Sequence, residues 1–490
     1  MLFSRFFLST LLLFPVGPAL LPAAEPAASP RRLTLNEAYD RALATDQSIS
    51  LALQAVVQAD LLPARAWTRL TPRLNGTLNS SQSGSRARGQ EFSSNQDGRA
   101  RLSLSQPLLD FTVKPAVRAG QLAAQESRMD YRGTVRDIIL GVATAYYDVL
   151  RQQELIAVNR ESLRLAEEQK NFATQRMEVG EVIRTDVLTA DVTVQRARRS
   201  LTESENALRL ARTILANALN LDPETVFEVI EPPGYALPGD SLHDLQIKAR
   251  NQRDDLQRLL TAIARRTENL AETRAGYLPS VSASVSAGRG VQQNSNSSGT
   301  DGQTDYSAGL SVSIPLFTGG EKALDLKQAE SEIIKAKLEY ERSAKASDEE
   351  VTSAWLQTQT LRQTLASLRA EVKSAEENHS LVQQQYLAGA TKSLDVLQAL
   401  TDLNTSRTDL TVSLFQYQLA LRELAARTAD FERARIEQSA ARLTRPAPSS
   451  PLVVPAAAEI PASPPPISQV PAPASKPAPA KKPLRKTVKP

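Results

Sequence analysis

The same order of motifs occurs twice in the chain, with the two copies about 207 to 209 residues apart. The segment RLSLSQPLLDF at 101–111 returns as GLSVSIPLFTG at 309–319, and MEVGEVIRTDVLTA at 177–190 returns as YLAGATKSLDVLQA at 386–399. The offset drifts by only two residues over this distance, which is the signature of a tandem structural duplication. Each half is therefore expected to build the same unit, one over residues 33–220 and one over residues 241–430.

The two ends differ in composition from these halves. Residues 1–24 place Arg5 before an apolar run and end in small residues, so we expect a signal peptide that leads to export. The chain has no cysteine, which excludes disulfides and a lipidated N-terminal cysteine. Residues 446–490 hold 14 prolines and most of the excess positive charge, and we expect a disordered tail of Pro, Ala and Lys. The repeats themselves lack the basic patch that nucleic-acid binding requires, so no nucleic-acid partner is expected.

Each half contains one predicted β-hairpin. The strands are expected at about 70–84 and 99–108 in the first half, and at about 277–288 and 306–315 in the second. Apolar and polar residues alternate along them, so that one side of the sheet is apolar and the other polar. The apolar side is expected to carry Leu74, Leu78, Val281, Val285, Leu310, Val312 and Ile314. A soluble sheet would need a core to cover this side, whereas a transmembrane strand turns it toward lipid.

Two hairpins supply four strands per chain. Four strands cannot close into a barrel, and an open sheet edge in lipid leaves backbone groups without hydrogen bonds. Several chains must therefore pool their strands, and the sequence predicts an oligomer.

A helix of unusual length follows each hairpin, at about 114–178 and 321–387. A heptad seam runs from Val351 to Tyr386 in the second helix and is repeated from Val142 to Met177 in the first, which predicts side-by-side packing as in coiled coils. Shorter helices are expected before each hairpin, at 34–66 and 241–274, and after each reversal, at about 184–220 and 392–430. Stacked end to end, the two shorter helices would match the long one, and a ring of such bundles makes a tube.

From about 33 to 430 the sequence resembles the outer membrane efflux protein family, the TolC-like channels. The resemblance rests on the duplicated order of elements, the strand-to-helix passages LSLSQPLLD and LSVSIPLFTGG, and the reversals VGEVIRTDVLTAD and AGATKSLDVLQAL. It implies an α+β membrane protein, a homotrimer whose 12-stranded transmembrane β-barrel continues into a long periplasmic α-helical coiled-coil barrel. Residues 221–240 and 431–445 would form the equatorial belt of this tunnel.

The same resemblance implies function and partners. It implies an outer membrane channel of a tripartite efflux or type I secretion system, a passive export duct driven by an inner-membrane pump through a periplasmic adaptor, or membrane fusion protein. The barrel would contact outer membrane lipids, and the helices and tail would lie in the periplasm. The pump class, whether RND, ABC or MFS, and the cargo stay open.

The two helix reversals are the candidate docking tips. Gly180 and Gly389 suit the left-handed position that ends many helices, so both are expected to form turns. In the family, adaptor hairpins meet the channel at these loops. The candidate docking residues are Val179, Gly180, Glu181, Ala388, Gly389 and Ala390.

Asp186 and Asp395 follow the reversals and are the candidate gate residues. An acid in the first turn of a helix also interacts favourably with the helix dipole, and that structural role is an equal alternative. In a trimer each aspartate becomes a ring of three charges, which by resemblance gates the tunnel and binds cations. Gln398 stands where a second acid would strengthen such a ring, so the Asp395 ring is expected to act singly.

No catalytic constellation is evident, and we expect no enzyme activity and no cofactor. The histidines are His243 and His379, and His379 occupies a seam position that favours packing over metal binding. GGEK at 319–322 lacks the spacing of a phosphate-binding loop. The alternative to a channel is a periplasmic coiled-coil adaptor or scaffold without a pore.

Overall fold

The fold was analysed in a computed structural model, which describes residues 31–85, 93–222, 225, 227–235, 239–294 and 300–441. The described elements all belong to one unit, Met1–Leu443. The signal peptide expected at 1–24 and the tail expected at 446–490 lie outside the described residues. So does the last part of the equatorial segment expected at 431–445.

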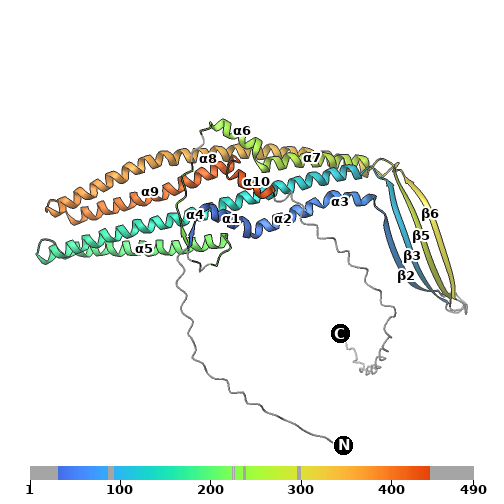
Figure 1. The fold of residues 1–490 in the computed structure, drawn as a ribbon, viewed down its shortest axis with the longest axis horizontal. Coiled ribbons are helices and arrows are strands. Elements are labelled where there is room, and N and C mark those ends of the chain that lie inside the picture. The colour runs from blue at the N-terminus through green and yellow to red at the C-terminus, as the bar shows by residue number, and fades with distance from the viewer. Residues whose placement is uncertain are drawn as a thin grey trace, which may run out of the picture. The chain divides into compact units, whose positions relative to one another are not determined.

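One helix of unusual length dominates each half, as predicted. Helix α4 (Val113–Glu178) has 66 residues and α8 (Glu321–Leu387) has 67, so each is about 100 Å long. After a reversal, α5 (Arg184–Ala218) packs against α4, and α9 (Ser393–Arg427) packs against α8, as Figure 1 shows. None of the described helices is both long and apolar enough to span a bilayer.

The seam predicted along α4 and α8 is where these helices are covered. Every seam position in both copies is buried or half-buried. Two polar seam residues of α4 find partners on α5: Lys170 Nζ lies 2.6 Å from Asp191 Oδ1, and Asn159 donates to Ser204 Oγ at 3.0 Å. The seam therefore joins α4 to α5 through small apolar contacts and a few satisfied polar pairs.

The helices that precede the hairpins are broken, where single helices were expected at 34–66 and 241–274. The first is divided into α1 (Leu35–Thr45), α2 (Gln47–Asp60), α3 (Leu62–Trp67) and the 3-10 turn η1 (Thr68–Leu70), and the second into α6 (Leu242–Gln252) and α7 (Asp254–Ala275). Asp46 causes the first break: its backbone is extended, and its side chain caps α2 by accepting from Ser48 N at 2.6 Å. These shorter helices pack along α4 and α8.

The hairpin strands form one antiparallel sheet in the order β2-β3-β5-β6. They are β2 (Arg73–Ser85), β3 (Ser93–Leu109), β5 (Ser280–Asn294) and β6 (Thr300–Ser313). At their connecting ends β3, β5 and β6 run up to six residues further than expected, because ladder pairing continues through Ser, Asn, Gln and Gly that carry no apolar alternation. The two halves join through the β3–β5 pair, and β2 and β6 each keep one edge without a neighbour among the described strands.

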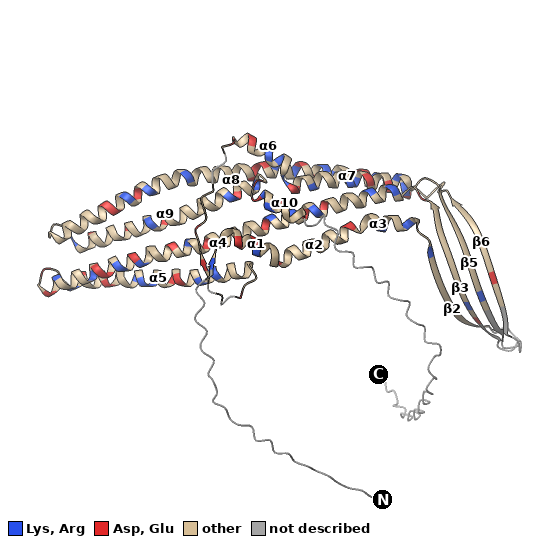
Figure 2. Ribbon diagram, in the orientation of Figure 1, with Lys and Arg blue, Asp and Glu red and all other residues tan. Residues whose placement is uncertain are grey.

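The sheet has the two unlike sides that the sequence predicted. Leu74 pairs with Leu104, and Val285 stands opposite both Leu104 and Ala308, so these side chains share one side. The other side carries Asn75, Thr77, Ser282, Ser284, Ser311 and Ser313. The apolar side is exposed, with Leu78 84% and Leu310 68% accessible. Figure 2 shows that charged residues are spread along the helices and are sparse on the strands.

The inter-repeat segment contributes a strand that the sequence did not reveal. Strand β4 (Phe227–Val229) pairs in parallel with β1 (Arg31–Leu33), and α10 (Arg433–Ala441) packs against α4 nearby. Tyr146 of α4 is fully buried and stabilises this small sheet. Its hydroxyl lies within hydrogen-bond distance of two carbonyl oxygens, 2.9 Å from Leu33 O and 2.5 Å from Ile230 O. Burial raises the pKa of this phenol to about 12.

Tyr146→Phe is expected to lower the free energy of unfolding by about 1–3 kcal/mol, because it leaves buried backbone groups without their hydrogen-bond partner. Thermal unfolding followed by circular dichroism measures the loss. Tyr340→Phe, at a half-buried tyrosine of α8, is the control and should leave the transition in place. Equal transitions for the two variants would contradict the role of the Tyr146 hydroxyl.

Candidate functional site at the helix reversals

Both reversals end in the same backbone motif. At the first, the φ angle of Gly180 is +82°, Gly180 N donates to Met177 O at 3.0 Å, and Glu181 N donates to Arg176 O at 2.9 Å. At the second, Gly389 has φ +75°, with equivalent bonds from Gly389 N to Tyr386 O and from Ala390 N to Gln385 O. This pair of bonds is the Schellman motif, which needs a left-handed residue and so favours glycine. The turns predicted at Gly180 and Gly389 are present.

The candidate docking residues are all exposed. Val179, Gly180 and Glu181 lie on one reversal, and Ala388, Gly389 and Ala390 on the other. Val179 is 71% accessible, and the nearby apolar side chains of Ile183 and Leu394 are 68% and 63% accessible. The tips therefore present uncovered apolar surface next to polar backbone turns.

Asp395 caps its helix. Its Oδ2 accepts a hydrogen bond from Thr391 Oγ1 at 2.6 Å and another from Lys392 N at 3.1 Å. The Thr391 hydroxyl, followed by the Lys392 backbone, lowers the pKa of the exposed Asp395 carboxyl, so it stays ionised. Asp186 lies half-buried in the first turn of α5. Asp395 therefore has the structural role at the start of a helix that was the alternative to gating, and its carboxylate is exposed, so it can also act as a gate residue.

A second acid lies further along α9 than the position considered in the sequence. Gln398 Nε2 donates to Asp402 Oδ1 at 2.9 Å, and both side chains are exposed. Asp395, Gln398 and Asp402 follow the three-four spacing of one helix face. The acidic surface near this tip therefore has two carboxylates, separated by the amide of Gln398.

Arg176 joins the two reversals, a contact that the sequence analysis missed. From the last turn of α4, its Nη1 donates to Tyr386 O at 2.7 Å, and its Nε donates to Glu181 Oε2 at 2.7 Å. The guanidinium also lies over the Tyr386 ring, 4.9 Å from the centroid, and Phe172 packs edge-on against the same ring. Tyr386 is 2% exposed. The seam predicted burial of Tyr386, but no sequence pattern pointed to an arginine from the other half.

The described residues offer no group of three or more His, Asp or Glu side chains placed to hold a metal ion. His379 is buried on the α8 seam, and burial, together with the positive charge of Arg407, lowers the pKa of its imidazole. These features fit a packing role for His379.

Comparison with known proteins places these features in a family. A family model described as "Outer membrane efflux protein" matches residues 38–221 and 246–442, one match for each half. A similar protein is the "Outer membrane efflux protein BepC" of Brucella suis biovar 1, 24% identical over 376 residues, which cover 76% of this chain and 79% of BepC. The "Alkaline protease secretion protein AprF" of Pseudomonas aeruginosa is 25% identical over 406 residues, covering 79% of this chain and 82% of AprF.

The fold also matches solved structures. The outer membrane channel CmeC of Campylobacter jejuni superposes with a TM-score of 0.68 at 18% identity, covering 83% of this chain and 89% of CmeC. At this identity the likeness concerns the fold, and it extends over the long helices and the four strands together.

Proposed function

The chain belongs to the outer membrane efflux protein family, and from this membership we propose that three copies form one export duct, with a twelve-stranded barrel above an α-helical tunnel. The protein is an outer membrane channel for efflux or secretion, with a TolC-like fold of two repeats, and is not an enzyme. The channel reading is thereby favoured over a scaffold without a pore.

One observation carries the proposal of a shared barrel. The four-stranded sheet has an exposed apolar side and two free edges, β2 and β6, within the described chain. Free backbone groups at a sheet edge are costly in lipid, and a barrel removes them. Three four-stranded sheets joined β2 to β6 give a barrel whose polar side lines the lumen. Purified protein inserted into planar bilayers should give stepwise single-channel currents, and a membrane that stays electrically silent would contradict the pore.

Members of this family act in tripartite efflux or secretion systems. We infer for this chain a periplasmic adaptor and an inner-membrane pump, with the tunnel and its two reversals in the periplasm. AprF is named for secretion and BepC for efflux, so the similarity is compatible with a secreted protein or an efflux substrate as cargo.

The exposed tips support adaptor docking at Val179–Glu181 and Ala388–Ala390. The chain has no cysteine, so a single introduced thiol reports on one position. Ala388→Cys carrying a photoreactive maleimide should cross-link in cells to a periplasmic coiled-coil adaptor, identified by mass spectrometry. Arg164→Cys, on an exposed face of α4 about four turns from the tip, is the matched control. Adaptor adducts at Arg164→Cys alone would contradict docking at the tips.

Asp395 is proposed to form a ring of three carboxylates at the tunnel mouth. Asp395→Ala is expected to leave the trimer assembled and to weaken block of the channel by divalent and trivalent cations, because a carboxylate ring attracts such ions. Titration of cobalt or hexamminecobalt against single-channel current in planar bilayers measures the block. Asp409→Ala, about four turns further from the tip on α9, is the control, and unchanged block in Asp395→Ala would rule out the gating role.

A further inference from the structure

The apolar side of the sheet carries one charged residue within the described strands. The side chains on this side come from even-numbered positions of β2, β3 and β6 and odd-numbered positions of β5, as the strand register requires. Arg289 of β5 is the charged member of this set; its register partners are Ala100 on β3 and Thr304 on β6. An arginine facing lipid is costly at the centre of a bilayer, by about 2–4 kcal/mol, and nearly free of cost at the interface.

Arg289 stands at the upper limit of the apolar band. Val281, next to the helices, is eight positions before Arg289, which is about 26 Å along the strand and about 20 Å across a membrane at the usual tilt. Beyond Arg289, the next level on this side consists of Ser80, Gly98, Val291 and Gly302, so valine is the one large apolar residue there. The distance of about 20 Å across the membrane is a little less than the ~25 Å height of a transmembrane apolar band, so Arg289 lies close enough to the outer interface for its long side chain to reach the headgroups.

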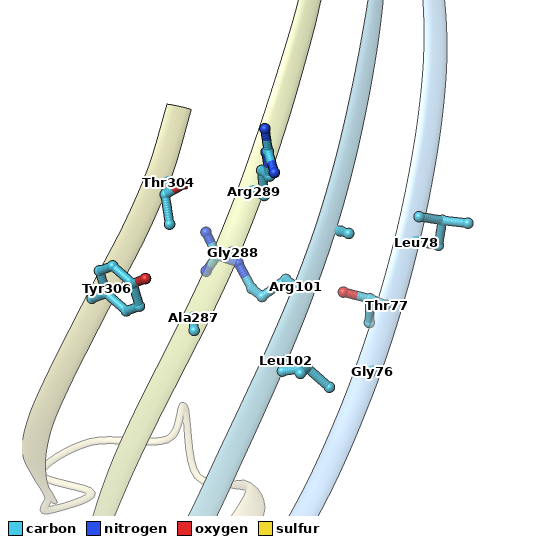
Figure 3. Close-up of a pocket in the computed structure, with 11 residues that line it drawn as sticks. Gly76, Thr77, Leu78, Arg101, Leu102, Ala287, Gly288, Arg289, Thr304 and Tyr306 are labelled. Atoms are coloured by element: carbon cyan, nitrogen blue, oxygen red, sulfur yellow. The ribbon is translucent and has the colours of Figure 1, made fainter. Parts of the chain in front are cut away.

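The surroundings of Arg289 have the character of that interface. Tyr306, one step nearer the helices on β6, is 80% exposed on the same side, and tyrosine prefers the level of lipid headgroups. Leu78, across Ala100 on β2, is 84% exposed. A hollow of about 470 Å³ at this level is lined from both sides of the sheet, by Arg289, Tyr306 and Leu78 of the apolar side and by Arg101 of the polar side (Figure 3).

We propose that Arg289 binds a phosphate group on the headgroup of an outer-leaflet lipid, with Leu78 and Tyr306 against its acyl chains. A guanidinium presents parallel N–H donors that match two phosphate oxygens, and this pairing holds best where water is partly excluded. Ala100 and Thr304 place no carboxylate next to the guanidinium in the register, so its charge is available to an external anion. Three protomers would hold three such lipids around the barrel.

Arg101 provides a matched control on the other side of the same sheet. Arg101 stands opposite Gly288 of β5 in the strand register. Its side chain runs over this glycine on the polar side of the sheet, since Arg101 Nε would lie 3.7 Å from the Cβ atom of an alanine at position 288 (Figure 3). The proposal rests on the proposed barrel, in which this polar side faces the lumen. Arg101 therefore has the same charge at nearly the same level but no access to lipid.

The test uses the purified trimer in detergent and bis-phosphorylated lipid A as the probe, with bound lipid counted by native mass spectrometry. Arg289→Gln is expected to weaken lipid A binding about tenfold, as loss of a charged hydrogen-bonded pair implies. Arg289→Lys should lie between, since it keeps the charge without the paired donors, and Arg101→Gln should bind as the unaltered protein does. Dephosphorylated lipid A should bind all forms equally weakly.

Three results would overturn the assignment: undiminished binding by Arg289→Gln, an equal loss in Arg101→Gln, or displacement of lipid A by millimolar inorganic phosphate, which would indicate a site for free phosphate. Single-channel conductance of each form separates this inference from the function on which it rests. If the Arg289→Gln trimer conducts and still binds lipid A fully, only the proposed lipid site is contradicted. If the unaltered protein never conducts, the proposed pore is contradicted.

Discussion

Val285→Arg is expected to prevent insertion of the channel into the outer membrane. Val285 lies in the middle of the apolar side, opposite Leu104 and Ala308, and is 53% exposed. An arginine facing lipid near the midplane costs about 2–4 kcal/mol for each chain, and a trimer carries that cost three times. Sucrose-gradient fractionation and heat-modifiability in SDS gels measure the amount of trimer in outer membranes.

Ser284→Arg is the control, since it places the same side chain one residue away on the polar side, where its register partner Gly309 leaves room. This variant should assemble normally, because the arginine would enter a water-filled lumen. If Ser284→Arg were excluded from the membrane and Val285→Arg were accepted, the assignment of the two sides would be reversed.

Arg176→Ala is expected to increase the single-channel conductance of the purified trimer several-fold. Arg176 holds the carbonyl and the ring of Tyr386 from the end of α4, so it ties the first helix pair to the second at the tip of each chain. Without it, the edge-on contact of Phe172 with the Tyr386 ring remains between the two pairs at that level. The tunnel mouth should then be wider, and a wider mouth conducts more current.

Arg164→Ala is the matched control for this conductance measurement. Arg164 lies on the same helix and pairs with Glu161 and Glu168 of α4 itself, so it joins no two helices. Its loss should leave the conductance unchanged. Equal conductance in Arg176→Ala and the unaltered channel would show that the Arg176–Tyr386 contact does not hold the mouth closed.

Much of the fold was predictable because it follows local patterns. The heptad step from Val351 to Tyr386 and the alternation from Val281 to Val285 each define one face, and the long helices ended within a residue or two of expectation. The breaks at Asp46 and Arg253 were missed, because helical periodicity continues across them. A capping side chain marks the break at Asp46, and a single residue with extended backbone makes the break at Arg253. The β1–β4 pair joins segments about 200 residues apart, a distance over which three-residue strands leave no pattern.

The geometry of the two reversals was predicted in part for the same reason. Gly180 and Gly389 were recognisable, because a left-handed backbone at a helix end selects glycine within a short motif. The contact of Arg176 with Tyr386 depends on how two helix pairs meet, and no spacing within one helix encodes it. Asp402 was likewise overlooked. Its place on the same helix face as Asp395 became evident only from the hydrogen bond that Gln398, which lies between them, donates to Asp402.

The pairing of the free strand edges tests the central claim most directly. Electron cryomicroscopy of the detergent-extracted protein should show three chains and twelve strands, with β2 of each protomer hydrogen-bonded to β6 of the next and the apolar side turned outward. A single chain with both edges unpaired, or a closed assembly whose apolar side faces the interior, would contradict the account.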